Sequence, residues 1–421
     1  MATVEMLEKA IKDGNLAKLS GIYGRHNFAR QPERFLKLLK AHAYNFSGEV
    51  YMFSSPGRIE VCGNHTDHNN GKVLAAAVTV DTLAAVTPAD NGIITVNSQG
   101  YPSFSVDTRE VSAPVAKEEG TSLALVKGVV AWFKEHGFKT GGFNASVVSD
   151  VAKGAGVSSS SSFELLIAEI LNVFYNGGKV DKIQKAIASQ YAENKYFGKP
   201  SGLMDQSAIS LGDICYIDFK NLSAPEIKDF PWPFTDTEII VVNAGGDHSD
   251  LTPNYAAIRR EMEEVAAYFG KKVLREVDKA RFMDAIPELK NKFSGRAILR
   301  SIHYFEENER IDRASAAIEA SDEKAFMDII NQSGESSYKL LQNCYPEGDT
   351  MQHIPLALAY AKRQKGVLAS RVHGGGFAGT ILNFVKASEA DSFAAAMSAL
   401  VGEQNIFRLD IRKSGACALE F

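Results

Sequence analysis

The sequence predicts a mixed α/β protein that folds as two domains, residues 1–232 and 233–421. The chain has 421 residues, which as a soft prior corresponds to two domains. Short stretches typical of strands are interspersed with longer stretches of helical periodicity, a pattern typical of α/β and α+β folds. The domain boundary is set at Pro231-Trp-Pro233, because proline interrupts both helices and strands.

The composition is that of a folded protein without a nucleic-acid or membrane partner. Hydrophobic residues make up 45% and charged residues 23%, which excludes a disordered or fibrous chain. Acidic residues outnumber basic ones by 51 to 46, and no long basic run is present. No apolar run approaches the ~20 residues needed to span a bilayer, and the N-terminus lacks the apolar core of a signal peptide. We therefore expect a cytoplasmic protein; the sequence leaves its oligomeric state open, and a monomer is compatible with it.

The cysteine pattern supports this assignment. The four cysteines lie far apart without Cys-x-x-Cys spacing, which indicates neither a disulfide framework nor a zinc site; they are Cys62, Cys215, Cys344 and Cys417.

Strand patterns dominate the first 150 residues. Helical periodicity covers residues 1 to about 45 and 122–133. Strand patterns, separated by turn-forming residues, occupy 49–53, the start of 59–71, 72–80, 83–88, 93–98 and 143–149.

A stretch rich in glycine and serine, residues 151–162, runs directly into apolar residues at helical spacing from Phe163 onward. Gly154 and Gly156 allow backbone N–H groups to approach a ligand, and the first turn of a helix carries the positive end of its dipole. An anion, most readily a phosphate, fits such a place. The stretch matches neither Gly-x-x-x-x-Gly-Lys-Ser/Thr nor Gly-x-Gly-x-x-Gly. A serine-rich linker is the alternative, but a linker would not lead into a strongly apolar helix.

Residues 58–68 place many polar side chains in one short segment, which is typical of a ligand-binding loop. Two alternatives remain open at this point. The segment is also compatible with a hydrogen-bonded surface turn. Metal binding by His65, Asp67 and His68 is a weaker hypothesis, because this spacing on a loop is nonspecific.

The remaining segments supply further candidate residues. A helix from Val180 to about Tyr196 contains Glu193 and ends in a turn that leads to Asp205. Strands are predicted at 213–218, 238–243 and 380–385, with a largely helical region between the last two. Asp247, His248 and Asp250 are interpreted as solvated loop residues. The segment 373–379 has four glycines, which indicates either close approach of the backbone to a ligand or a tight turn.

Three of these segments, in this order, resemble motifs of the GHMP small-molecule kinases, most closely the galactokinases. Residues 57–71 look like the sugar-binding signature of that family, 154–160 resemble its ATP loop, and 374–379 are similar to its C-terminal glycine motif. Further matches are Glu193-Asn194, Gly202-Leu-Met-Asp-Gln206 and Tyr255 followed by Arg259-Arg260.

The resemblance implies a fold and a reaction. The fold would have a ribosomal-protein-S5-like N-terminal domain and a ferredoxin-like C-terminal domain, with the active site in the cleft. The reaction would be ATP-dependent phosphorylation of the anomeric (C1) hydroxyl of galactose, giving galactose 1-phosphate and ADP. By the same resemblance, Asp205 would act as general base or orient the hydroxyl, and Arg58 would lie beside it.

The resemblance also implies three binding sets. Mg²⁺ would be held by Ser160 and Glu193, whose oxygens are suitable ligands. The sugar would be bound by Asn64, His65, Thr66, Asp67, Gly202 and Tyr255. The triphosphate of ATP would be bound by Gly154, Ala155, Gly156, Val157, Ser158, Ser159 and Ser160.

The chain departs from the family pattern at five positions. The family usually has Glu in place of Asn64, Tyr in place of His68, Pro in place of Ala152, Ala in place of Ser161, and Thr or a similar residue in place of His373. Asn64 matters most, because the family's Glu resembles a contact to the distal hydroxyls of the sugar. A neutral amide there admits an alternative substrate with a modified C6, such as galacturonate. A non-catalytic galactose and ATP sensor is a second alternative, and a kinase of a simple alcohol such as mevalonate a third.

Overall fold

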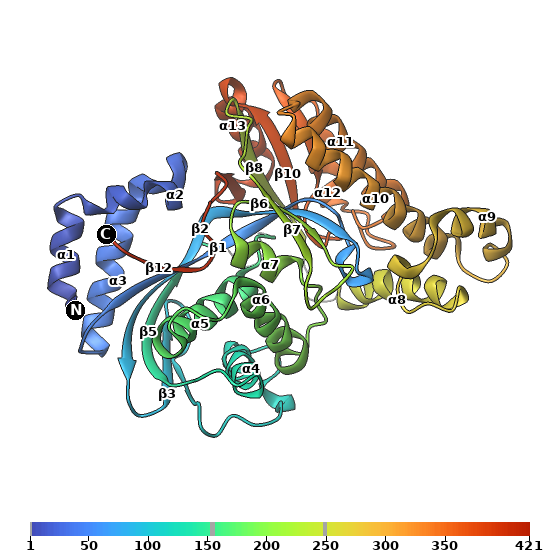
Figure 1. Cartoon of the computed structure of the whole chain (residues 1–421). Helices are drawn as coiled ribbons and strands as arrows, with labels where there is room; N and C mark the ends of the chain where they lie inside the picture. The colour runs from blue at the N-terminus through green and yellow to red at the C-terminus, as the bar shows by residue number, and fades with distance from the viewer. Residues whose placement is uncertain (1, 152–155, 247–250) are drawn as a thin grey trace.

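The computed structural model describes residues 2–151, 156–246 and 251–421, and it consists of two β-sheets flanked by helices (Figure 1). The predictions for Ala152, Gly154 and Ala155 and for the loop 247–250 lie outside the described residues.

The larger sheet has eight strands in the order β12-β1-β2-β5-β3-β4, and β6 pairs with both β2 and β7. All neighbours run antiparallel except β3 and β5. One end of the long strand β2 pairs with β6 and the other with β5, so β2 joins both parts of the sheet. The strands are β1 (Tyr51–Cys62), β2 (Lys72–Ala89), β3 (Ile93–Ser98), β4 (Phe104–Asp107), β5 (Gly142–Ser149), β6 (Ile214–Asp218), β7 (Glu226–Phe230) and β12 (Cys417–Leu419).

Helices cover both faces of this sheet, which explains why β1 and β2 are almost entirely buried. Met52 and Leu83 pack with α1 (Val4–Lys12), α2 (Ser20–Asn27) and α3 (Gln31–Asn45). The adjacent residues Phe53 and Ala84 point the other way, because side chains alternate along a strand, and pack with α4 and α5. The helices on that face are α4 (Ser122–Glu135), α5 (Ser159–Asn176), α6 (Lys182–Tyr191) and α7 (Met204–Leu211).

The smaller sheet has the order β11-β8-β10-β9 and is antiparallel throughout. Its strands are β8 (Thr237–Gly245), β9 (Val367–Val372), β10 (Gly379–Lys386) and β11 (Ile406–Leu409). Val242 and Phe393 belong to a core that this sheet forms with α12 (His353–Ala361) and α13 (Ala390–Val401). The other helices are α8 (Thr252–Tyr268), α9 (Lys279–Leu289), α10 (Gly295–Glu319) and α11 (Glu323–Ser336).

The two sheets share one hydrophobic core. Ile59 and Leu74 of the larger sheet, Val241 of the smaller sheet and Ile318 of α10 belong to the same buried cluster. This shared core fixes the sheets relative to each other and holds the loops at their junction in place. The division of the chain at residue 232 stays a prediction; β12, from the far end of the chain, pairs with β1.

Two long strands are continuous in the structure, although the sequence pattern divides each of them. Residues 54–58 are predicted to separate two strands, but β1 runs through them with a register shift between Pro56 and Gly57. Such an irregularity accommodates a proline that cannot donate to the ladder. The predicted strands 72–80 and 83–88 are one strand, β2. Among the described residues, no helix combines the length and apolarity required to cross a membrane.

Candidate active site

Arg58 of β1 and Asp205 of α7 form a bidentate ion pair at the junction of the sheets. The Arg58 Nε donates to Asp205 Oδ1 at 2.8 Å, and Nη2 donates to Oδ2 at 2.9 Å. Arg58 Nη1 also donates to the carbonyl of Gly156, and the Ser158 hydroxyl donates to Asp205 Oδ2. The structure therefore brings together the predicted catalytic pair and the described part of the predicted phosphate loop.

The surroundings of Asp205 keep its carboxylate charged. Burial alone would raise the pKa of Asp205, but the charge and hydrogen bonds of Arg58, together with the Ser158 hydroxyl, bring this pKa below its usual value. The carboxylate can therefore accept a hydrogen bond from a hydroxyl at neutral pH. It is a weak base, because its charged form is strongly stabilised.

The serine run divides into residues that face the site and residues that face the core. Helix α5 begins at Ser159, inside the serine run and before the apolar residues that start at Phe163, and Ser158 precedes it in a left-handed conformation with φ of 61°. Ser160 reaches Glu193. Ser161 and Ser162 are fully buried, and the Ser162 hydroxyl donates to the backbone of β1.

Gly156 lies where the phosphate loop meets the smaller sheet. Its φ is 69°, and a Cβ atom at this position would collide with the Thr380 hydroxyl of β10 and press on the His373 ring. Only glycine fits both the left-handed backbone and the close approach. The loop is thus held against residues from the opposite end of the chain.

The two residues predicted to bind Mg²⁺ lie in contact. The Ser160 hydroxyl donates to Glu193 Oε1 at 2.9 Å, and the Glu193 side chain is 1% exposed. Gln206 Nε2 donates to the other carboxylate oxygen at 2.8 Å. Glu193 lies in a π-helical segment, Ala192–Phe197, a rare conformation that often occurs at functional sites.

These two oxygens fit a magnesium ion that also binds phosphate. Across residues 2–151, 156–246 and 251–421, no group of three or more His, Cys, Asp or Glu side chains is arranged to hold a metal ion. Mg²⁺ is usually bound by one or two protein oxygens, with waters and substrate phosphates completing its shell. The pair Ser160 and Glu193 matches that requirement.

Glu164, on α5 one turn beyond Ser160, is not among the site residues that the sequence predicted. It is fully buried, and neither of its carboxyl oxygens has a hydrogen-bond partner among the described residues. Burial and then the neighbouring Glu193 raise the pKa of Glu164 well above its usual value, which favours the neutral form of this side chain. The available signal was an acidic residue four positions after Ser160, between the apolar residues Phe163 and Leu165 of α5.

Asp67 lies at the surface of the predicted sugar loop and faces the segment before α7. A Cβ atom on Gly202 would overlap the Asp67 carboxylate, and the backbone N–H of Met204 donates to Asp67 Oδ2 at 3.4 Å. Burial and the nearby charge of Asp205 raise the pKa of Asp67 to about 6. Asp67, Gly202 and Asp205 therefore lie close together.

Asn64 and Thr66 lie beneath the loop rather than on its surface, and both are fully buried. The Asn64 amide donates to the Gly374 carbonyl at 2.7 Å and accepts from Asn343 at 2.7 Å. The Thr66 hydroxyl donates to the backbone of its own loop. In this structure the side chains of both residues hold the shape of the loop.

Three successive carbonyls of the glycine segment accept hydrogen bonds from the predicted sugar site. Asn64 donates to Gly374, His65 Nε2 donates to Gly375 at 2.9 Å, and the Tyr255 hydroxyl donates to Gly376 at 3.0 Å. Since Nε2 of His65 carries the proton, its Nδ1 accepts from His68 Nε2 at 3.1 Å. Burial lowers the pKa of His65 to about 4, so the ring is neutral. The glycine segment 374–379 thus fastens the predicted sugar loop.

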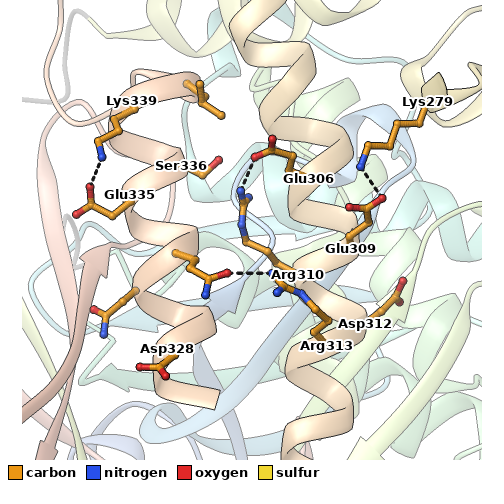
Figure 2. A pocket seen from close by; sticks show the side chains of 13 residues that line it. Lys279, Glu306, Glu309, Arg310, Asp312, Arg313, Asp328, Glu335, Ser336 and Lys339 are labelled. Atoms are coloured by element: carbon orange, nitrogen blue, oxygen red, sulfur yellow. Dashed lines mark hydrogen bonds and ion pairs between the residues drawn. The ribbon is translucent and has the colours of Figure 1, made fainter. Parts of the chain in front are cut away.

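A large hollow lies elsewhere, between the outer faces of α10 and α11 (Figure 2). Its volume is about 1140 Å³, and several of its charged side chains pair with one another. The pairs include Lys279 with Glu309 at 2.6 Å, Arg310 with Glu306 at 2.6 Å and Lys339 with Glu335 at 3.0 Å. None of the predicted site residues that the structure describes lines this groove. We interpret it as a solvated, charge-paired surface.

Comparison with known proteins agrees with this geometry. Residues 40–88 match the family model described as galactokinase galactose-binding signature, and residues 124–213 match GHMP kinases N terminal domain. The structure resembles Lactococcus lactis galactokinase complexed with galactose, with a TM-score of 0.77 at 23% identity over 98% of this chain and 100% of that one. It also resembles a mevalonate kinase, with a TM-score of 0.60 at 14% identity over 86% of this chain and 99% of that one. The fold and the site define a GHMP kinase.

Two relatives narrow the assignment. The galactokinase of Limosilactobacillus reuteri (strain DSM 20016) is 32% identical over 356 residues, covering 81% of this chain and 87% of the relative. The galactokinase of Streptomyces coelicolor is 31% identical over 350 residues, covering 82% and 87%. The chain belongs to the galactokinase family.

Proposed function

We propose that this protein transfers the γ-phosphoryl group of ATP to the C1 hydroxyl of galactose, giving galactose 1-phosphate and ADP. The observation that carries the proposal is the Arg58–Asp205 pair, which contacts Gly156 and Ser158 on one side and has Asp67 nearby on the other. The relatives named above and the match to a galactose-binding signature support galactose as the acceptor. The comparisons support neither a C6-modified sugar nor a non-catalytic sensor.

In this reaction Asp205 accepts a hydrogen bond from the C1 hydroxyl and aims its oxygen at the γ-phosphorus. Its lowered pKa makes complete proton removal before transfer unfavourable. Phosphoryl transfer through a loose transition state does not require it, because the hydroxyl proton leaves late. Arg58 holds the Asp205 carboxylate in place and supplies positive charge beside the transferring group.

The nucleotide is bound by the loop 154–160 and the first turn of α5, where unpaired backbone N–H groups attract phosphate. Ser160 and Glu193 hold Mg²⁺, which when bound neutralises charge on the phosphates. In the sugar site, Asp67, His65, Gly202 and Tyr255 surround the hydroxyl groups, while Asn64 and Thr66 support the loop from below. The site lies between the proposed domains, residues 1–232 and 233–421.

Steady-state kinetics with ATP and four sugars tests the proposal. Galactose is expected to be phosphorylated with the highest kcat/KM among galactose, galacturonate, N-acetylgalactosamine and glucose. Asp205→Ala should abolish galactose-dependent ATP consumption while the variant stays folded by circular dichroism. Background turnover of galactose by the wild-type protein, together with rapid turnover of another of these sugars, would contradict the assignment.

A further inference from the structure

Lys199, which follows the π-helical segment, is bound to the carboxylate assigned to the metal ion. Its Nζ donates to Glu193 Oε1 at 2.9 Å, and its backbone N–H donates to the Glu193 carbonyl at 3.1 Å. The Lys199 side chain is 57% exposed, whereas that of Glu193 is 1% exposed. A flexible cation at the surface therefore neutralises a carboxylate at the floor of the cleft.

Both carboxylate oxygens of Glu193 are already engaged. Oε1 accepts from Ser160 at 2.9 Å and from Lys199, and Oε2 accepts from Gln206 at 2.8 Å. A divalent ion that bound Oε1 together with the Ser160 oxygen would lie close to the ammonium group on the same oxygen, and the two cations would repel each other. Two cations thus compete for one carboxylate oxygen.

The chemistry of lysine suits such an exchange. Its ammonium is a compact, strongly hydrated charge on a flexible four-carbon stem, so it can leave the carboxylate for solvent without moving the backbone. Gly198, directly before it, turns the chain with φ of 82° and ends the π-helical segment. The backbone hydrogen bond between Lys199 and Glu193 therefore keeps the ammonium within reach whether or not it is bound.

We propose that Lys199 is an internal counter-ion that competes with the divalent cation for Glu193 and thereby sets the affinity of the protein for that ion. The inference rests on the proposed function in one respect, the assignment of the ion to Ser160 and Glu193. Lys199 is a positioning residue here, since it acts through Glu193. Nothing in the local sequence indicates this role, because Lys199 stands in a turn beside glycine and proline.

Titration of the protein with Mn²⁺ alone, followed by electron paramagnetic resonance, tests the competition. Lys199→Met should tighten Mn²⁺ binding by roughly twofold to fivefold, a range set by typical energies of partly exposed ion pairs. Lys199→Arg, which keeps the charge, should stay near the wild-type affinity. Lys195→Met is the matched control, because Lys195 is an exposed lysine on the same π-helical segment. Equal Mn²⁺ affinity in wild type and Lys199→Met would overturn the proposal.

A second measurement locates the effect at Glu193. In EDTA, Lys199→Met should lower the Tm relative to Lys195→Met, and in a Glu193→Gln background this difference should disappear. A Lys199→Met effect of the same size in both backgrounds would mean that Lys199 acts on another group, and the proposal would fail. Neither measurement uses sugar or turnover, so a failure here is distinguishable from a failure of the proposed galactose kinase activity.

Discussion

Asn64 Nδ2 donates to the Glu60 carboxylate, lying 3.0 and 3.1 Å from its two oxygens, in the fully buried layer beneath the sugar loop. Glu60 in turn accepts from Arg371 at 2.7 Å. The amide at position 64 is therefore matched to a carboxylate four residues earlier. A second carboxylate in its place would face the first one in the protein interior.

Asn64→Asp should consequently destabilise the protein. Two buried carboxylates in contact repel each other, and we expect a loss of about 2–4 kcal/mol in the free energy of unfolding at pH 7. Urea denaturation followed by fluorescence measures this loss. Asn221→Asp serves as control, because Asn221 is exposed and its side-chain oxygen is the acceptor for Ser223, a role that aspartate keeps. Surface substitutions usually change the free energy of unfolding by less than about 0.5 kcal/mol. A change that small for Asn64→Asp would contradict this account of the buried pair.

Asp205→Asn should separate catalysis from folding and binding. Replacing the charged carboxylate that orients the hydroxyl with a neutral amide is expected to lower kcat by about 10²- to 10⁴-fold, the usual range for a positioned acid or base. The KM for ATP should change little, because Asp205 is assigned to the sugar hydroxyl. Rapid-quench measurement of galactose 1-phosphate formation gives both constants. A kcat within a factor of three of wild type would remove Asp205 from the mechanism.

Gly156→Ala should disrupt the contact between the phosphate loop and β10. The added methyl group collides with the Thr380 hydroxyl, and alanine is strained in the left-handed backbone conformation of this position. Because both effects displace the loop, we expect the KM for ATP to rise at least about tenfold. Gly14→Ala is the control for backbone strain alone, because Gly14 has φ of 85° and nothing lies within 4 Å of the point that a Cβ atom would occupy there. Thr380→Ala, combined with Gly156→Ala, should recover part of the affinity; no recovery would mean that backbone strain dominates.

The affinity for galactose should depend on the protonation of Asp67. The pKa of Asp67 is raised to about 6, so the carboxylate is charged above pH 6 and protonated below it. Only the charged form accepts hydrogen bonds from two sugar hydroxyls through both oxygens. The KM for galactose should therefore rise about tenfold between pH 6.5 and pH 5, following the protonated fraction expected for this pKa. Asp67→Asn should have a high KM at every pH, and a pH-independent KM in the wild-type protein would refute the assignment.

The sequence predicted those parts of the site that are carried by short contiguous motifs. The glycine and serine stretch, the loop 58–68 and the turn before Asp205 each have local features, and their resemblance to one family implied their convergence. The roles of Asn64, Glu164 and Lys199 were not predictable in this way. They depend on contacts that no motif encodes: Asn64 with Asn343, far along the chain, and Glu164 and Lys199 with Glu193.

Partners distant in the sequence also explain why the predicted break within β2 was wrong. Asp81 in the middle of β2 is a poor strand former, and the sequence pattern predicts a break just beside it. In the fold this fully buried carboxylate accepts from Tyr23 at 3.0 Å and from Arg34 at 2.5 Å, both from the N-terminal helices. These distant partners offset the cost of burying the charge, and the strand continues through it.

The pairing of β12 with β1 has a consequence for how the chain is made. Residues 417–419 lie more than 350 positions beyond β1, yet they form one border of the sheet that carries Arg58. During synthesis, the border of β1 stays unpaired until residues 417–419 have left the ribosome. Nascent chains stopped short of residue 417 therefore retain an open strand edge that is prone to aggregation.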